Sequence, residues 1–159
     1  MSTIMDNVPT VAHTETDYVT FYVGDVLIGI DITGVDEINR HVEVTPVPHA
    51  PPFVCGVFNL RGDVVTAVDL HVILGISQDA SDAARTRTVI VRSKDEQIGL
   101  RVSRIADVVT VRSDAVDPVP PNFSSADSRF FQGVFKMENE LLNLLDVDAA
   151  LSVGKGSDK

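Results

Sequence analysis

The sequence predicts an all-β protein made of two similar small modules. Two observations support this prediction. Short apolar segments with alternating polar positions follow one another closely and are broken by Gly, Pro and Asp, which is typical of β-barrels rather than of βαβ units. The chain also contains an internal duplication, because two pairs of segments match each other at a nearly constant offset.

The clearest repeat pairs residues 56–70 (GVFNLRGDVVTAVDL) with residues 133–147 (GVFKMENELLNLLDV), at an offset of 77 residues. Each copy predicts a strand, a tight turn and a second strand. Gly62 in the first turn is expected to adopt positive φ. Its repeat partner is Asn139, the other residue type that readily takes the left-handed conformation, so we expect the turn to be the same in both copies.

A short helical turn is expected after each of these hairpins. In the first copy Asp69 precedes the apolar segment 70–74, which Gly75 closes. Aspartate is a favoured N-cap and glycine a favoured C-terminal residue, so this pattern predicts one or two helical turns. In the second copy Asp146 stands in the same position, ahead of residues 147–151.

The second repeat pairs residues 19–38 (VTFYVGDVLIGIDITGVDEI) with residues 89–108 (VIVRSKDEQIGLRVSRIADV), at an offset of 70 residues. Each copy predicts another β-hairpin, with apolar residues at period two. Gly29 and Gly99 interrupt equivalent strands. Glycine within a strand usually marks a bulge or a close backbone approach, so we expect one or the other at both positions.

These repeats give a folded region over residues 17–151, with halves 17–76 and 88–151. The remaining expectations, in chain order, are a disordered tail over 1–16, strands over 17–23, 26–32 and 40–47, a boundary over 77–87, a surface loop over 114–128, and a frayed tail over 152–159.

The composition limits the possible functions. The chain has 159 residues, of which 44% are hydrophobic, and a formal net charge of −10. This charge argues against nucleic acid and anionic membrane surfaces as partners. No apolar run approaches the ~20 residues of a membrane helix, and the first residues lack the pattern of a secretory signal. With one cysteine, no intramolecular disulfide forms, so we expect a cytoplasmic protein.

No catalytic, metal or cofactor site is apparent in the sequence. The histidines, which we expect on the surface, lack metal-ligand spacing; they are His13, His41, His49 and His71. Cys55 has no neighbouring base and is expected to be a small buried hydrophobe. Asp63 and Asp69 form no acid–base pair, because the N-cap role explains Asp69. These observations favour a binding or scaffolding module.

Arg61 is the candidate binding residue. It lies at the turn of the first repeated hairpin, where its repeat partner is Glu138, so the duplicated fold does not require a base there. Two interpretations stay open. Arg61 is either a solvated turn charge or a contact residue held by Glu37, in which case its guanidinium suits a carboxylate through two hydrogen bonds.

Several motifs together resemble the chemotaxis coupling proteins, the CheW-like family. They are GIDI (29–32), VDEI (35–38), TP (45–46), PFVCGV (52–57), NLRG (59–62), VV (64–65) and VDL (68–70). The similarity extends from about Tyr18 to Leu151. It implies two five-stranded SH3-like β-barrels packed side by side, with no catalytic activity and no cofactor. It also implies an adaptor that joins the signalling tip of chemoreceptors to the regulatory domain of the histidine kinase CheA, in arrays on the inner face of the membrane.

By the same resemblance, Arg61 and Glu37 belong to the receptor-facing surface. The predicted partner-binding residues are Val35, Glu37, Ile38, Asn59, Arg61 and Gly62. The chain departs from the family at Thr66, where proline is common, and at His71, where arginine is common. The second departure removes a positive charge near the expected contact surface, and we expect it to alter which partner is recognised.

Two other functions stay open at this point. One is a CheW-like scaffold in a non-flagellar receptor–kinase pathway, such as surface motility or development. The other is an enzyme or small-molecule sensor built on a similar pair of barrels, which a pocket with convergent polar groups would indicate.

Overall fold

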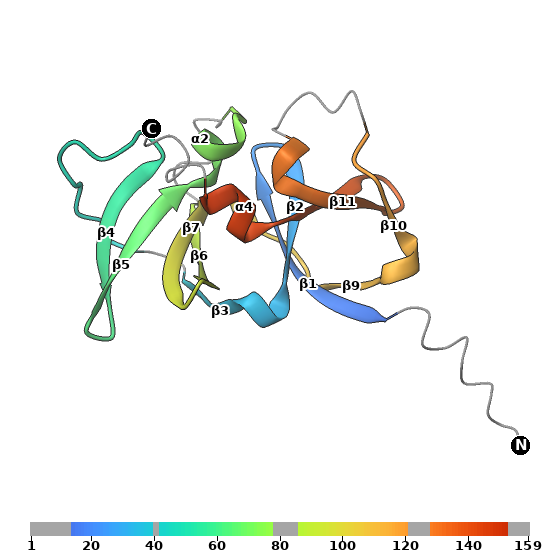
Figure 1. Ribbon diagram of the computed structural model, residues 1–159, viewed down its shortest axis with the longest axis horizontal. Coiled ribbons are helices and arrows are strands. Elements are labelled where there is room, and N and C mark those ends of the chain that lie inside the picture. The colour runs from blue at the N-terminus through green and yellow to red at the C-terminus, as the bar shows by residue number, and fades with distance from the viewer. Residues whose placement is uncertain (1–13, 40–41, 78–85, 121–127, 153–159) are drawn as a thin grey trace, which may run out of the picture.

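The computed structural model describes residues 14–39, 42–77, 86–120 and 128–152, which form two β-sheets side by side (Figure 1). The five-stranded sheet has the spatial order β3 (Val35–Asn39), β6 (Arg87–Ser93), β7 (Glu96–Val102), β5 (Asp63–Asp69) and β4 (Val54–Leu60). The seven-stranded sheet has the order β10 (Val116–Asp117), β11 (Phe131–Lys136), β12 (Leu141–Leu145), β2 (Val26–Asp31), β1 (Glu15–Val23) and β8 (Arg104–Ile105), with β9 (Val109–Arg112) also paired to β1.

Helical segments are short, which confirms the predicted all-β class. They are the α-helices α2 (Leu70–Leu74) and α4 (Val147–Leu151) and the 3-10 helices η1 (Ile32–Gly34), η2 (Ser113–Ala115) and η3 (Ser128–Phe130). Within the residues described above, no helix is long and apolar enough to cross a membrane.

Both repeated hairpins end in the predicted capped helix. Asp69 is the N-cap of α2, and its Oδ1 accepts a hydrogen bond from the backbone N–H of His71 at 2.9 Å. Asp146 is the N-cap of α4, and its Oδ1 accepts from the backbone N–H of Ala149 at 3.2 Å. Gly75 closes α2 in the left-handed conformation at φ 70°. These local signals are correct in both copies.

The two sheets do not follow the two halves of the sequence. β2 of the first half pairs in parallel with β12 of the second, and β7 of the second half pairs in parallel with β5 of the first. Each sheet therefore combines the first hairpin of one half with the second hairpin of the other. The halves 17–76 and 88–151 describe the duplication and not the spatial modules.

In the five-stranded sheet, the two edges are joined by one stretch of chain. β3 pairs with β6 at one edge, and Thr45 then pairs with Val57 of β4 at the other, through N···O distances of 2.8 and 2.9 Å. This leaves few unpaired edges, as in a small SH3-like barrel. The predicted strand over 40–47 is wrong, because the strand lies at Val35–Asn39 and only Thr45 pairs after it among the residues described there.

In the seven-stranded sheet, the segment after β9 pairs with β11 in the same way as the segment after β3 pairs with β4. Asp117 of β10 pairs with Val134, the repeat partner of Val57. The expected loop over 114–128 therefore contains a short strand. Residues 121–127 of that loop lie outside the described part of the chain.

β1 begins earlier than predicted. Glu15 and Thr16, assigned above to a tail, pair with Arg112 and Val111 of β9. The pairing was not predictable because the partner strand lies about 95 residues away in the sequence. Parts of three predicted segments lie outside the described residues: 1–13 of the tail over 1–16, 78–85 of the boundary over 77–87, and 153–159 of the tail over 152–159.

The turn of the second repeated hairpin differs from the first. β4 and β5 are joined by the two residues Arg61 and Gly62, whose φ angles are 51° and 93°. β11 and β12 are joined by four residues, and Met137 donates from its backbone N–H to the carbonyl of Glu140 at 2.8 Å. Asn139 does not adopt positive φ, so the prediction of equal turns is wrong. A four-residue connection reverses the chain without a left-handed residue there.

The two sheets share one apolar core. Its largest cluster contains buried residues of both sheets, including Phe21 and Ile28 from one and Val68 and Leu100 from the other. At Gly99 a Cβ would lie 2.9 Å from the ring of Phe58. The atoms nearest to a Cβ at Gly29 also belong to side chains, those of Leu142 and Tyr18. The prediction of a bulge or a close backbone approach at these two glycines is therefore wrong, since side chains fill the space beside them and the register shifts lie elsewhere.

Candidate partner-binding site

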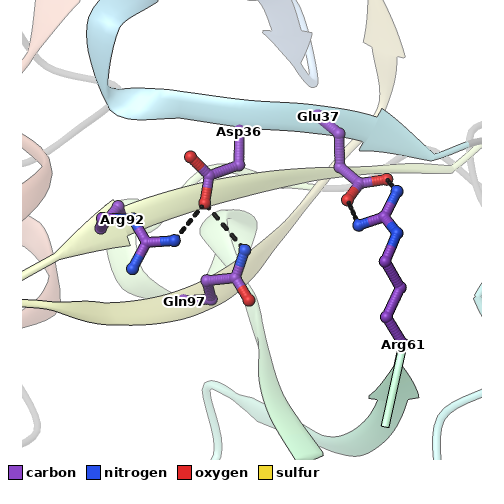
Figure 2. A network of polar contacts seen from close by, with 5 residues as sticks. All are labelled: Asp36, Glu37, Arg61, Arg92 and Gln97. Atoms are coloured by element: carbon purple, nitrogen blue, oxygen red, sulfur yellow. Dashed lines mark hydrogen bonds and ion pairs between the residues drawn. The ribbon is translucent and has the colours of Figure 1, made fainter. Parts of the chain in front are cut away.

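Arg61 and Glu37 form an ion pair across the five-stranded sheet (Figure 2). Glu37 lies on β3 at one edge, and Arg61 lies at the turn that ends β4 at the opposite edge. Both terminal nitrogens of the guanidinium donate to the carboxylate, Nη1 to Oε2 and Nη2 to Oε1, the latter at 3.1 Å. The hydrogen bond with Glu37 and its negative charge raise the pKa of Arg61, so the guanidinium stays charged.

The pair is presented to solvent mainly through its arginine. The side chain of Arg61 is 73% exposed, and that of Glu37 is 22% exposed. Glu37 therefore orients the guanidinium without covering it. Guanidinium has five N–H donors, so donors that Glu37 does not use remain for an acceptor on another molecule.

The turn that carries Arg61 is held by two of the other predicted residues. Gly62 donates from its backbone N–H to Oδ1 of Asn59 at 3.0 Å, which closes the turn from β4. Positive φ at both Arg61 and Gly62 is the geometry of a two-residue turn that matches the twist of the strands. Asn59 and Gly62 therefore fix the direction in which Arg61 points.

A β-bulge in β3 places two carboxylates on one side. Val35 pairs with Val91 of β6, but Glu37 pairs with the adjacent Ile90, so Asp36 is an extra residue in the strand. Successive strand side chains normally point to opposite faces. Here Asp36 and Glu37 point to the same side of β3, as Figure 2 shows.

Asp36 has its own polar partners, which the sequence analysis missed. Its Oδ2 accepts from Nη2 of Arg92 at 3.1 Å and from Nε2 of Gln97 at 2.8 Å (Figure 2). Arg92 and Gln97 lie on β6 and β7. No sequence signal identifies them, because their position beside Asp36 depends on the register of strands more than 50 residues apart.

The two apolar residues predicted for this site have different environments. Val35 is half-buried and packs against the main core. Ile38 directly follows Glu37 and is 42% exposed. Val64, just after the turn of Arg61, is 72% exposed and was not predicted. A contact surface at this site therefore offers apolar as well as charged groups.

The seven-stranded sheet has no equivalent of this polar site. The repeat partners of Arg61 and Glu37 are Glu138 and Asp107, which are both acidic. The repeat partner of Asp36 is Ala106. An ion pair at the equivalent place is thus impossible, and the duplicated fold forms without one. The Arg61–Glu37 pair distinguishes one sheet from the other.

His71 is not on this surface, contrary to the expectation that the histidines are exposed. It is 5% exposed, and its ring lies between Asp69 and Ser103. The expected position of this side chain near the contact surface is therefore wrong, while the expected effect of the missing arginine on partner recognition stays a prediction. Helix α2 points this side chain into the junction between the sheets. His49 is exposed as expected, while His13 and His41 lie outside the described residues.

Asp69 lies at this junction, and its charge makes the stability of the protein depend on pH in the acid range. Burial opposes its ionisation, but hydrogen bonds from the ring and backbone of His71 and the charges of His71 and Arg101 outweigh burial, so its pKa is lowered. Because the pKa of Asp69 is lower in the folded protein than in the unfolded chain, its charge stabilises the fold at pH values above the ordinary aspartate pKa of about 3.9. This stabilisation is lost as the pH falls through the lowered pKa of the folded protein.

We therefore expect Asp69→Asn to weaken the acid dependence of stability. Asparagine is an equally good N-cap, so the substitution removes the charge and keeps the cap. Urea unfolding at pH values from 7 to 2 should show a smaller loss of free energy of unfolding for the variant than for the unmodified protein. Equal losses would contradict the role of the Asp69 charge.

The described residues offer no group arranged for covalent chemistry or metal binding. Three or more potential metal ligands do not come together in this part of the chain. Cys55 is half-buried, and burial, followed by the charge of Asp69, raises its pKa although Arg101 opposes this. Its thiol is therefore a poor nucleophile, in line with the predicted small apolar residue.

Comparisons with known proteins show the family of this chain. The family model described as the CheW-like domain matches residues 17–155. The chain belongs to the CheW-like family. The resemblance predicted from its motifs is confirmed, and so is its role as a chemotaxis coupling adaptor.

Individual relatives cover most of this CheW-like chain. The chemotaxis protein CheW of Rhizobium meliloti is 33% identical over 133 residues, covering 84% of this chain and 85% of the relative. That of Treponema pallidum is 32% identical over 137 residues, covering 84% and 81%. The crystal structure of the scaffolding protein TtCheW from Thermoanaerobacter tengcongensis matches with a TM-score of 0.74 and 28% identity, covering 83% of this chain and 89% of that one. The SH3-like fold implied by the resemblance agrees with this match.

Proposed function

We propose that this CheW-like protein joins the signalling tip of chemoreceptors to the regulatory domain of the histidine kinase CheA, in the cytoplasm at the inner face of the membrane. The observation that carries the proposal is the exposed Arg61–Glu37 pair, which exists on one sheet and is excluded from its duplicate. A fold that needs the pair for stability would be expected to keep it in both copies.

In this proposal Arg61 and Glu37 contact the receptor tip. Glu37 orients the guanidinium, and the remaining N–H donors of Arg61 bind carboxylate or carbonyl oxygens of the receptor. Asn59 and Gly62 set the turn, and Val35 anchors β3 in the core. Ile38 adds an exposed apolar contact beside the charged pair.

The adaptor acts without catalysis in this proposal. Two sheets offer two different surfaces, so the protein can contact two partners at the same time. Linking such contacts in an array raises the effective concentration of each partner, so no single interface has to be tight. The signal then passes through the relative positions of the bound partners.

The two other functions considered above have less support. The relatives described here are named chemotaxis proteins, which favours chemotaxis over a non-flagellar pathway. A groove of about 420 Å³ lies beside the ends of β5 and β7, next to Arg92 and Gln97. Both side chains already donate to Asp36, so the groove gives no specific indication of a small-molecule sensor.

Calorimetric titration tests the proposal directly. The purified protein is titrated with the regulatory domain of CheA from the same organism, with and without a receptor-tip fragment. We expect saturable binding to each partner and a ternary complex of all three. Absence of binding to both partners, with a sample shown to be folded, would overturn the proposed partners.

A further inference from the structure

The exchange of hairpins creates two junctions between the sheets that correspond to each other. At one junction, α2 of the five-stranded sheet faces the β1–β2 turn of the seven-stranded sheet. At the other, α4 of the seven-stranded sheet faces the β6–β7 turn of the five-stranded sheet. In Figure 1, α2 and α4 lie near the middle of the molecule, where the sheets meet. The second residue of each helix makes a polar contact across its junction.

These two contacts differ in chemistry. At the α4 junction, Asp148 accepts a hydrogen bond directly from the hydroxyl of Ser93, the last residue of β6. At the α2 junction, the equivalent residue is His71. Its Nε2 lies 2.8 Å from Oγ of Ser103, and the same Oγ accepts from the backbone N–H of Gly24 at 2.9 Å. His71 therefore reaches the β1–β2 turn through a serine.

Ser103 lies where the chain passes from one sheet to the other. It follows β7 and precedes β8, and its side chain is fully buried. Its backbone N–H donates to the carbonyl of Tyr22 at 2.8 Å, which fixes its position beside the turn. Gly24 itself is tightly covered, since a Cβ there would lie 2.8 Å from Cγ2 of Ile76.

The contacts that run from Asp69 through His71 and Ser103 to Gly24 fix the hydrogen on one ring nitrogen of His71. The Asp69 carboxylate can only accept, so Nδ1 of His71 carries the hydrogen that bridges the 3.0 Å contact between them. In the neutral ring Nε2 is then an acceptor, and in the charged ring it is a donor. The Ser103 hydroxyl can meet either form: it donates to a bare Nε2, or its two lone pairs accept from Gly24 and from a protonated Nε2. In both forms Ser103 keeps its contacts with His71 and with Gly24.

We infer that His71 is a positioning residue that holds the β1–β2 turn against α2, by orienting the Ser103 hydroxyl as acceptor for Gly24. This role goes beyond the proposed function and does not depend on any partner. It assigns a use to a buried histidine at the position where the family commonly has arginine.

Amide hydrogen exchange at Gly24 tests the inference in the protein alone. His71→Asn retains a group near Nδ1 but is too short to reach Ser103, whereas His71→Gln places its amide oxygen near the position of Nε2. We expect Gly24 to exchange about fivefold faster in His71→Asn and Ser103→Ala, as for the loss of one hydrogen bond, and His71→Gln to restore most of the protection. Ser93→Ala, at the other junction, is the matched control and should leave Gly24 unchanged.

The inference is overturned if His71→Asn leaves Gly24 exchange unchanged, or if His71→Gln exchanges as fast as His71→Asn. The second outcome would mean that the histidine acts through packing alone.

A measurement on the unmodified protein covers the case in which the variants do not fold. Imidazole ¹⁵N shifts should show hydrogen on Nδ1, the nitrogen that faces Asp69. A ring with hydrogen on Nε2 alone would overturn the inference, because Nδ1 and the Asp69 carboxylate would then both be acceptors and Asp69 could not hold the ring against Ser103.

Discussion

Gly56→Ala is expected to destabilise the protein by about 3 kcal/mol or more, because the added methyl group overlaps backbone. A Cβ at this position would lie 2.2 Å from the carbonyl oxygen of Thr45 and 2.6 Å from Cγ1 of Val44. Gly56 also has φ 146°, a conformation that residues with a side chain rarely adopt. A backbone oxygen cannot rotate away as a flexible side chain can.

The overlap occurs where the five-stranded sheet is closed. Thr45 and the neighbouring Val57 exchange two backbone hydrogen bonds, which join the segment after β3 to β4. A methyl group on Gly56 must push Thr45 outward and weaken both bonds. We therefore expect the variant to lose the contact between the two edges as well as stability.

Chemical denaturation measures this effect. Gly34→Ala is the matched control, since it adds the same methyl group where no atom lies within 4 Å. The control should unfold at nearly the same urea concentration as the unmodified protein, and Gly56→Ala at a much lower one. Equal urea midpoints for the two variants would contradict this prediction. They would show that the segment at Thr45 moves away from the added methyl group at little cost in stability.

Arg61→Glu is expected to reduce affinity for the receptor tip about tenfold or more, with little change in stability. The substitution replaces an exposed donor by an acceptor and places two carboxylates opposite each other at Glu37. Arg61 is 73% exposed, so its replacement opens no cavity, and Glu37, at 22% exposed, still reaches solvent when it loses this partner. Titration of the variant with the receptor fragment, together with thermal unfolding, separates binding from folding.

Two variants show what the pair contributes. Arg112→Glu makes the same charge change at another exposed ion pair, Arg112–Asp114, and should bind normally. The exchange variant Glu37→Arg with Arg61→Glu restores an ion pair with reversed direction. If Arg61 donates to the receptor, this variant stays defective. Recovery of binding would show that the pair only shapes the turn, and unchanged binding by Arg61→Glu would contradict the site.

Local structure was largely predictable from the sequence. Turn residues, alternating apolar positions and capping aspartates act between neighbours in the chain, so both copies of each hairpin and both capped helices are correct. Asn139 is the exception, because the length of the β11–β12 connection removed the need for a left-handed residue. Of the site, the sequence indicated Arg61, Glu37 and the turn between Asn59 and Gly62.

What only the tertiary structure decided is how distant strands pair. Backbone hydrogen-bonding groups are the same on every strand, so nothing in β2 or β5 specifies a partner from the other half of the chain. Because of that pairing, each sheet contains one hairpin from each half of the sequence. The register of β3 on β6 created the bulge that turns Asp36 and Glu37 to one side. The junction between the sheets buried His71, because burial depends on which elements meet there and not on the residues beside it in the sequence.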